Sequence, residues 1–267
     1  MLSIPEKIIF LLLAATSFYF AYVGFRRVVQ VIARGQNGPV PRLNQLPRRI
    51  FDGIMRTLGQ TTVFRARPVA SFFHSFIFYG FMLYLAVNAV DALNGFLPVS
   101  FTSRLNFGVV GSIYLLIADI LTFLILVGMV YFLIRRFVVK PKTITHGARV
   151  KLHERVAAGG VQLDSLIVGG FILLHVGSRL LAESFLLASH GGPDPYQPIT
   201  SIVAGLIGPG DGRIIGWHVF WWGALGIILA FLPYFPRSKH LHLFAAPANF
   251  ALDRRTEELA PVPLGVL

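Results

Sequence analysis

Hydrophobic residues gather in five long stretches of this chain, and polar residues fill the segments between them. The stretches cover roughly residues 8–25, 69–91, 107–134, 160–182 and 214–235. Each approaches or exceeds the ~20 residues with which an α-helix crosses about 30 Å of hydrocarbon. The third is longer than a membrane requires, so it must tilt or protrude. The pattern predicts an all-α integral membrane protein built as a five-transmembrane-helix bundle.

The segment 47–59 has a different pattern. It starts with Pro47, a residue suited to the first turn of a helix. Its apolar residues fall on one helical face and its arginines elsewhere; the apolar set is Ile50, Phe51, Ile54, Met55 and Leu58. This predicts an amphipathic helix at the cytoplasmic interface, with lipid anchoring favoured over partner docking. We expect a single membrane domain over residues 1–250 and a cytoplasmic tail over 251–267.

Composition supports the membrane class and removes several cofactors. The chain is 55% hydrophobic and 13% charged, and that charged share is about half of the ~25% usual in soluble proteins. It contains no cysteine. Cysteine-ligated iron–sulfur clusters, thioether-attached haem and disulfides within this chain are therefore excluded. Any iron–sulfur relay must belong to a partner protein.

Basic residues are distributed unevenly between the predicted loops. Residues 26–67 carry nine Lys and Arg, the loop 135–157 carries seven, the segment after Pro236 carries four, and the opposite side carries four. Basic residues accumulate on the cytoplasmic side of membrane proteins. The bias predicts that the N-terminus lies outside and the C-terminus in the cytoplasm, and it explains the net charge of +12 without nucleic acid. Only Lys7 precedes the first stretch, so we expect a retained helix rather than a cleaved signal peptide.

Histidines occur in or next to three of the stretches. A histidine in hydrocarbon is costly and marks a functional site by default. With a helical rise of 1.5 Å per residue, His74 lies about 8 Å inside the inner boundary, His175 about 22 Å from it, and His218 about 6 Å from the outer face. His240 and His242 follow the fifth stretch, at or just beyond the inner boundary.

These depths predict two tiers. His74 with His242, or with His240 as the alternative, forms an inner site, and His175 with His218 forms an outer site. Neutral imidazoles on two helices suit the two axial positions of a haem iron, so the arrangement predicts two b-type haems. The outer match requires the fourth span to end near 179–182. The alternative is that the histidines form hydrogen bonds between helices.

Other polar residues in the spans have open roles. Arg179 shares a helix face with His175, where it binds either a haem propionate or Glu183 at the next turn. Glu183 and His190 are candidates for quinone-coupled proton transfer on the outer side. Asp119 lies in the middle of the third span and needs a partner or a proton. His146 and His153 fall in the basic cytoplasmic loop; we expect both to be solvated, with His153 a minor alternative ligand for the inner haem.

The segment PRSKHLHLFAAP, residues 236–247, resembles the end of the respiratory nitrate reductase gamma subunit, a membrane cytochrome b family. In that family a haem-ligating histidine follows the proline by six residues, which matches His242, while His240 falls on an apolar position of the family. The segment SFFHSFIFYGFMLY, residues 71–84, is similar to the second span of the family. Its first haem histidine matches His74, but its second is replaced by Tyr84.

The resemblance also bears on the outer haem and on the partners. His218 is the match for the outer ligand in the last span, although it lies further from His242 than in the family. His175 has no counterpart, and we expect it to replace the ligand missing at Tyr84. The chain looks most like the gamma-like domains associated with heterodisulfide-reductase-type iron–sulfur proteins, some of which are thought to link electron-transfer flavoprotein to menaquinone.

Together these features predict a di-haem cytochrome b subunit in the cytoplasmic (inner) membrane of a prokaryote. It would pass electrons between a cytoplasmic iron–sulfur or flavoprotein partner and a membrane quinone, as part of a respiratory chain. The alternative is a haem-free membrane anchor whose histidines bridge helices. The five stretches are not repeated, which argues against a transporter of the inverted-repeat type.

Overall fold

The computed structural model describes residues 1–35, 44–97, 108–144, 151, 154–208 and 210–253, and the described part contains helices and no strand. Five helices are long and apolar enough to cross a membrane: α1 (Ile4–Ile32), α4 (Pro68–Phe96), α6 (Val109–Ile134), α8 (Gly160–His190) and α10 (Arg213–Phe231). Each contains one of the five predicted stretches or nearly all of it. The expectation of five helices long and apolar enough to span a membrane is therefore confirmed for the described residues, while the orientation of the termini stays a prediction.

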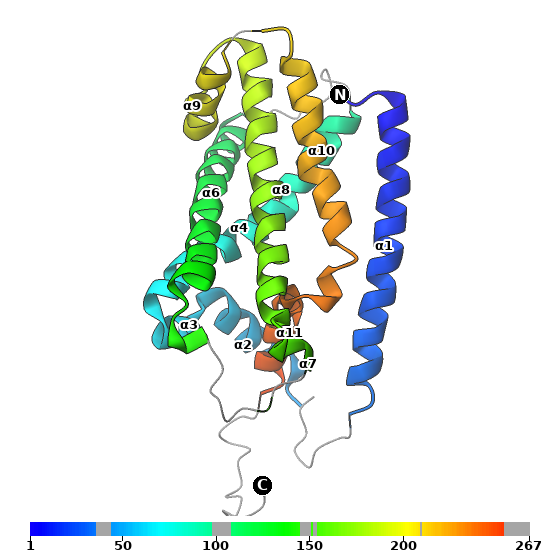
Figure 1. Ribbon diagram of the computed structural model, residues 1–267, viewed down its shortest axis with the longest axis vertical. Coiled ribbons are helices and arrows are strands. Elements are labelled where there is room, and N and C mark those ends of the chain that lie inside the picture. Colours follow the sequence, from blue (N-terminus) through cyan, green and yellow to red (C-terminus); the bar gives the residue numbers. More distant parts are fainter. Residues whose placement is uncertain (36–43, 98–107, 145–150, 152–153, 209, 254–267) are drawn as a thin grey trace, which may run out of the picture.

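Short elements cover the two ends of the bundle (Figure 1). At the end near the N-terminus, α9 (Pro198–Ile207) follows α8. At the opposite end lie α2 (Leu46–Gly59), α3 (Thr61–Ala66), α7 (Glu154–Ala157) and α11 (His242–Ala251). Single turns occupy η2 (Arg135–Val139), η3 (Lys142–Ile144), η4 (Phe235–Arg237) and η5 (Lys239–Leu241). The predicted interfacial helix over residues 47–59 corresponds to α2.

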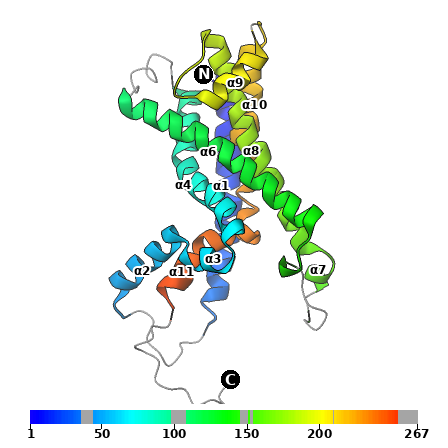
Figure 2. The ribbon, with the colours of Figure 1, turned by 90° about the vertical axis from the view of Figure 1, so that its left-hand side faces the viewer.

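Helix α8 packs against α10, α6 and α9, whereas α4 packs on α6. Helix α1 lies against α10 and η4, and Lys7 near its start donates to the carbonyl of Phe96 at the end of α4. Figure 2 shows α6 running obliquely across the bundle, and α2 lying beside α11 beneath it. Glycines allow close approach of the long helices. A Cβ on Gly80 of α4 would overlap the side chain of Ile125 in α6, and one on Gly169 of α8 would lie 2.7 Å from Leu133. Small residues at such crossings favour packing, because lipid provides no hydrophobic drive to associate helices.

Helix α8 is longer than the sequence suggested, because it continues past residues 179–182 to His190. It ends at Gly191, whose φ of 86° places it in the left-handed region that glycine adopts readily. The charged side chains that marked the expected end do not stop the helix, since Arg179 finds a partner inside the bundle. His175 consequently lies nearer the middle of this span than expected.

Asp119 has its partner at the start of α9. Its carboxylate accepts hydrogen bonds from the backbone N–H groups of Ile199 and Thr200 at 2.7 and 3.1 Å, and from the Thr200 hydroxyl at 2.6 Å. A carboxylate at a helix N-terminus satisfies unpaired N–H groups and interacts favourably with the helix dipole. The buried acid of the third span therefore anchors α9 to α6.

The close contact at Gly80 generates a prediction about stability. We expect Gly80→Ala to lower the free energy of unfolding by about 1–3 kcal/mol, since the added methyl group overpacks against Ile125. Gly177→Ala is the matched control: nothing lies within 4 Å of a Cβ at Gly177, and alanine favours the helix. Thermal unfolding in detergent would measure both. Equal unfolding temperatures for the two variants would contradict the proposed packing contact.

Candidate functional site

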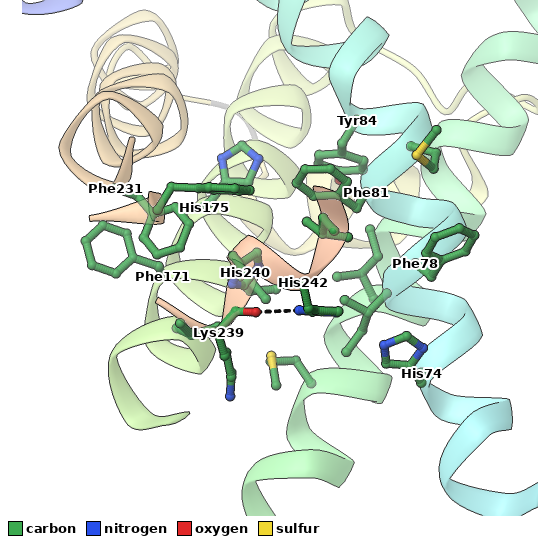
Figure 3. A pocket seen from close by; sticks show the side chains of 18 of the residues that line it. His74, Phe78, Phe81, Tyr84, Phe171, His175, Phe231, Lys239, His240 and His242 are labelled. Carbon is green, nitrogen blue, oxygen red and sulfur yellow. Dashed lines mark hydrogen bonds between the residues drawn. The ribbon is translucent and has the colours of Figure 1, made fainter. Parts of the chain in front are cut away.

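A cavity of about 810 Å³ opens between the long helices and the segment that follows α10. Its walls are mainly aliphatic and aromatic, with phenylalanines from α4, α8 and α10. Four histidines line it: His74 on α4, His175 on α8, His240 in η5 and His242 at the start of α11 (Figure 3). Four of the histidines singled out from the sequence thus share one largely apolar space.

A chain reversal brings His240 and His242 to this cavity. Helix α10 ends at Phe231, and Pro233 and Pro236 lie in the turns that follow. Proline disrupts the interior of a helix but is tolerated in turns. Asp164 of α8 fixes the reversal by accepting hydrogen bonds from the Tyr234 hydroxyl at 2.7 Å and from the Lys239 N–H at 3.4 Å. Burial and the neighbouring Asp164 raise the pKa of Tyr234 to about 12, so its hydroxyl stays a donor.

His74 and His242 lie side by side, with their ring centroids 6.4 Å apart and their planes at 46°. A bond from a histidine nitrogen to a metal ion is about 2 Å long, so two imidazoles that share one metal have centroids about 6 Å apart. The observed separation fits this arrangement. The same separation holds between His240 and His242, so distance alone does not select the pair.

Hydrogen bonds at Nδ1 distinguish the four histidines. In His74 this nitrogen lies 3.1 Å from Oε1 of Gln60, in His175 it lies 3.0 Å from the carbonyl oxygen of Ala224, and in His242 it contacts the carbonyl oxygen of Lys239. A carbonyl oxygen can only accept, so each Nδ1 carries the proton and each Nε2 keeps its lone pair. This is how metal-ligating histidines are usually oriented.

His240 differs from the other three. Its ring is in contact with Phe81, Phe231 and Phe235, and its Nδ1 is buried with no hydrogen-bond partner in the part of the chain that the structure describes. Burial, followed by the neighbouring His242 and Lys239, lowers the pKa of His240 to about 4, so the ring is neutral near pH 7. No acceptor fixes its tautomer, which makes His242 the better oriented ligand of the two.

His218 lies elsewhere. Its Nδ1 is 2.8 Å from Oε1 of Glu6 in α1, and it does not line the cavity. His175 binds the carbonyl of Ala224, which lies six positions after His218 in α10. Six positions correspond to a rotation of about 600° around the helix axis, or one and two-thirds turns. The two positions consequently face different sides of α10. The expected pairing of His175 with His218 is not found in this arrangement.

Arg179 forms an ion pair that the sequence analysis missed. Its Nε donates to Oδ2 of Asp91 in α4 at 2.8 Å, and both side chains are buried. Its guanidinium lies 5.7 Å from the ring centroid of Tyr84, and Tyr84 in turn lies 5.6 Å from the ring of His175. Tyr84 lines the cavity and Arg179 does not. The available signal was the acidic Asp91 at the end of the second stretch.

Three basic side chains line the cavity: Arg135, Arg136 and Lys239. Burial lowers the pKa of Lys239; Asp164 opposes this effect and the charge of Arg136 adds to it. An anionic group between these cations would relieve their repulsion and gain charge-assisted hydrogen bonds. His146 and His153 lie outside the described residues, so their expected places in the basic loop stay predictions.

No known protein family and no solved structure matches the chain. Two curated proteins are similar to it. One is "Probable iron-sulfur-binding oxidoreductase FadF" of Bacillus subtilis, 29% identical over 256 residues, covering 94% of this chain and 33% of the relative. The other is "EtfAB:quinone oxidoreductase" of Syntrophomonas wolfei, 21% identical over 239 residues, covering 85% of this chain and 31% of the relative.

The chain spans about a third of the length of these relatives. Both are named as oxidoreductases, which supports an electron-transfer role for this chain. Neither is named as a nitrate reductase gamma subunit, so that resemblance stays a prediction.

The Asp91–Arg179 pair generates a second prediction. Removing one partner of a buried ion pair costs about 3–5 kcal/mol, because the other charge is left uncompensated. We expect Arg179→Leu to be the more damaging change, since it strands Asp91 together with Glu183, which also interacts with Arg179. Asp91→Asn should cost less, because Glu183 still faces the guanidinium.

Thermal unfolding of both variants in detergent would test this order, with the exposed Arg27→Leu as the matched control. Equal losses in the Asp91 and Arg179 variants would show that Glu183 takes no part in compensating the charge.

Proposed function

We propose that this chain is the membrane cytochrome b subunit of a quinone-linked oxidoreductase, and that it binds b-type haem in the histidine-lined cavity. The observation that carries the proposal is the shared geometry of three histidines. His74, His175 and His242 all line one apolar cavity, and all three have Nδ1 held by a carbonyl oxygen. Each therefore presents an Nε2 lone pair suited to an iron ion.

In this proposal His74 and His242 hold the inner haem, with His240 as the alternative to His242. Arg136 and Lys239, which line the cavity, would bind the carboxylates of the porphyrin, and the phenylalanines would contact its apolar faces. His175 would hold a second haem from α8. Haem supplies one-electron redox chemistry, while the protein supplies ligands, orientation and dielectric. Arg179 is occupied by Asp91, so the cations at the cavity itself are better candidates for propionate partners.

The proposed electron donor and acceptor rest on chemistry and on the relatives. The residues of this chain include no cysteine, so the iron–sulfur clusters of such a complex would lie outside them, and we propose a partner of the heterodisulfide-reductase type. The names of the relatives include "iron-sulfur-binding" and "EtfAB:quinone", which supports electron-transfer flavoprotein upstream and quinone, in particular menaquinone, downstream. We place the protein in the cytoplasmic membrane of a prokaryote, with α2, α3 and α11 on the cytoplasmic side.

One observation favours a second candidate, a haem-free anchor. His218 joins α10 to Glu6 of α1, and His175 joins α8 to the backbone of α10. Both contacts bridge helices, which a purely structural histidine also does. An anchor role does not explain why four histidines line one largely apolar cavity.

Haem content tests the function directly. In a dithionite-reduced minus oxidised spectrum with pyridine haemochrome quantification, we expect about two b-type haems per chain. His74→Ala and His242→Ala should each remove the inner haem, and His175→Ala the second one, because each change deletes a histidine that would hold the iron.

His190→Ala is the matched control, since His190 is exposed at the end of α8; it should retain the full haem content. Loss of a haem in His218→Ala would restore the pairing predicted from the sequence. Folded protein that contains no haem and takes up none would favour the anchor.

Orientation is tested separately. Because the chain has no cysteine, single substitutions give an unambiguous label. Ser3→Cys, beside the start of α1, should react with a membrane-impermeant maleimide added to intact cells. Arg48→Cys, at an exposed position of α2, should react only after the membrane is opened. The reverse pattern would contradict the proposed orientation.

A further inference from the structure

Gln60 occupies an unusual place between α2 and α3. Its backbone is left-handed, with φ 47° and ψ 25°, a conformation that residues other than glycine, asparagine and aspartate seldom adopt. Its side chain is long and polar, yet only 4% of the residue is exposed. Strained backbone and a buried polar side chain at one residue often accompany a functional constraint.

The backbone of Gln60 is fixed on both sides. Its N–H donates to the carbonyl oxygen of Thr57 at 3.3 Å, and its own carbonyl accepts from the N–H groups of Val63 and Phe64 at 3.1 and 3.0 Å. The end of α2 is tied to α4 by the Tyr79 hydroxyl, which donates to the carbonyl of Leu58 at 2.6 Å. The amide of Gln60 is therefore held at a defined place beside α4.

That place is next to His74. Oε1 of Gln60 lies 3.1 Å from Nδ1 of His74, whereas the corresponding acceptors at His175 and His242 are backbone carbonyls. His74 is thus the one cavity histidine among these three whose orientation depends on a side chain. The amide nitrogen of Gln60 has no hydrogen-bond partner within the described residues, so it is the amide oxygen that ties this buried side chain to its surroundings, through His74.

We propose that Gln60 is a positioning residue for His74. Its amide oxygen holds the proton on Nδ1 and thereby leaves the Nε2 lone pair directed to the cavity. The tautomer is a property of the protein alone; its consequence for an iron ligand rests on the proposed function. If the amide of Gln60 were turned so that its NH₂ group faced Nδ1, that nitrogen would have to accept. The proton would then sit on Nε2 and prevent it from binding a metal.

The first experiment measures the tautomer without haem. The protein is labelled with ¹⁵N-histidine, and the His74 resonances are assigned by their loss in His74→Gln. We expect His74 to be protonated at Nδ1 in the haem-free wild type and in Gln60→Glu, because a carboxylate can only accept. In Gln60→Met, which has a similar shape and no strong acceptor, we expect a shift of His74 toward the Nε2-protonated form. A wild-type His74 protonated at Nε2 would overturn the proposal, whether or not the protein binds haem.

The second experiment measures haem binding and potential. Removal of a hydrogen-bond partner behind a metal ligand typically weakens metal binding about 10- to 100-fold, and we expect that loss in a haem titration of Gln60→Met. Gln60→Glu should retain haem and lower the midpoint potential of the inner haem, because a carboxylate makes the imidazole a stronger donor. A merely structural role for Gln60 would not shift the potential in Gln60→Glu.

Gln45→Met is the matched control. Gln45 also has a left-handed backbone, with φ 49°, and is exposed at the other end of α2; it does not line the cavity. This variant should bind haem as the wild type does. If the wild type holds haem and Gln60→Met binds it equally well with an unchanged potential, the positioning role is wrong and the proposed function stands. A wild type without haem would instead refute the proposed function, and the tautomer measurement would still decide the role of Gln60.

Discussion

The structure depends on the constraint that a polar group inside hydrocarbon must find its partner within the protein. The buried charged side chains Arg179, Asp91 and Asp119 obey it. Arg179 pairs with Asp91 between α8 and α4, and Asp119 receives three hydrogen bonds from the start of α9. These contacts join helices that apolar packing alone would leave free to slide, since lipid and the bundle interior are similarly apolar.

A neutral histidine has two ring nitrogens to satisfy, because one donates a hydrogen bond and the other accepts one. A carbonyl oxygen beside Nδ1 satisfies the donor and leaves the acceptor Nε2 without a partner from the same contact. At His74, His175 and His242, which line the cavity, this leaves the lone pair of Nε2 for a further partner. In the proposed function that partner is a haem iron.

Much of this arrangement follows from the sequence. The five helices and the amphipathic α2 are visible as patterns of apolar residues, because the membrane fixes helix length and the interface fixes the polar face. The approach of His74 and His242 followed from depth, since both lie near the same boundary. Depth says nothing about rotation around a helix axis, however, and His218 faces α1 for that reason.

The sequence predicted neither the true end of α8 nor the partner of Arg179, and both errors have the same cause. An arginine near the end of a span suggests the membrane boundary when its partner is unknown. Asp91 lies 88 residues away along the chain, and no local pattern connects the two. Once they are paired, the arginine is compatible with the interior and the helix continues to Gly191.

Tyr84 lies where the buried ion pair meets the cavity. Its hydroxyl is 2.6 Å from that of Thr122, which in turn donates to the carbonyl of Ala118. Its ring is 5.6 Å from the ring of His175 and 5.7 Å from the guanidinium of Arg179. The resemblance to the gamma subunit predicts a haem-ligating histidine at this position, but here the side chain is anchored to α6 and lines the cavity. Tyr84 therefore connects α4 to α6 beside the Asp91–Arg179 pair, and it brings the cavity wall into contact with the charged part of the bundle.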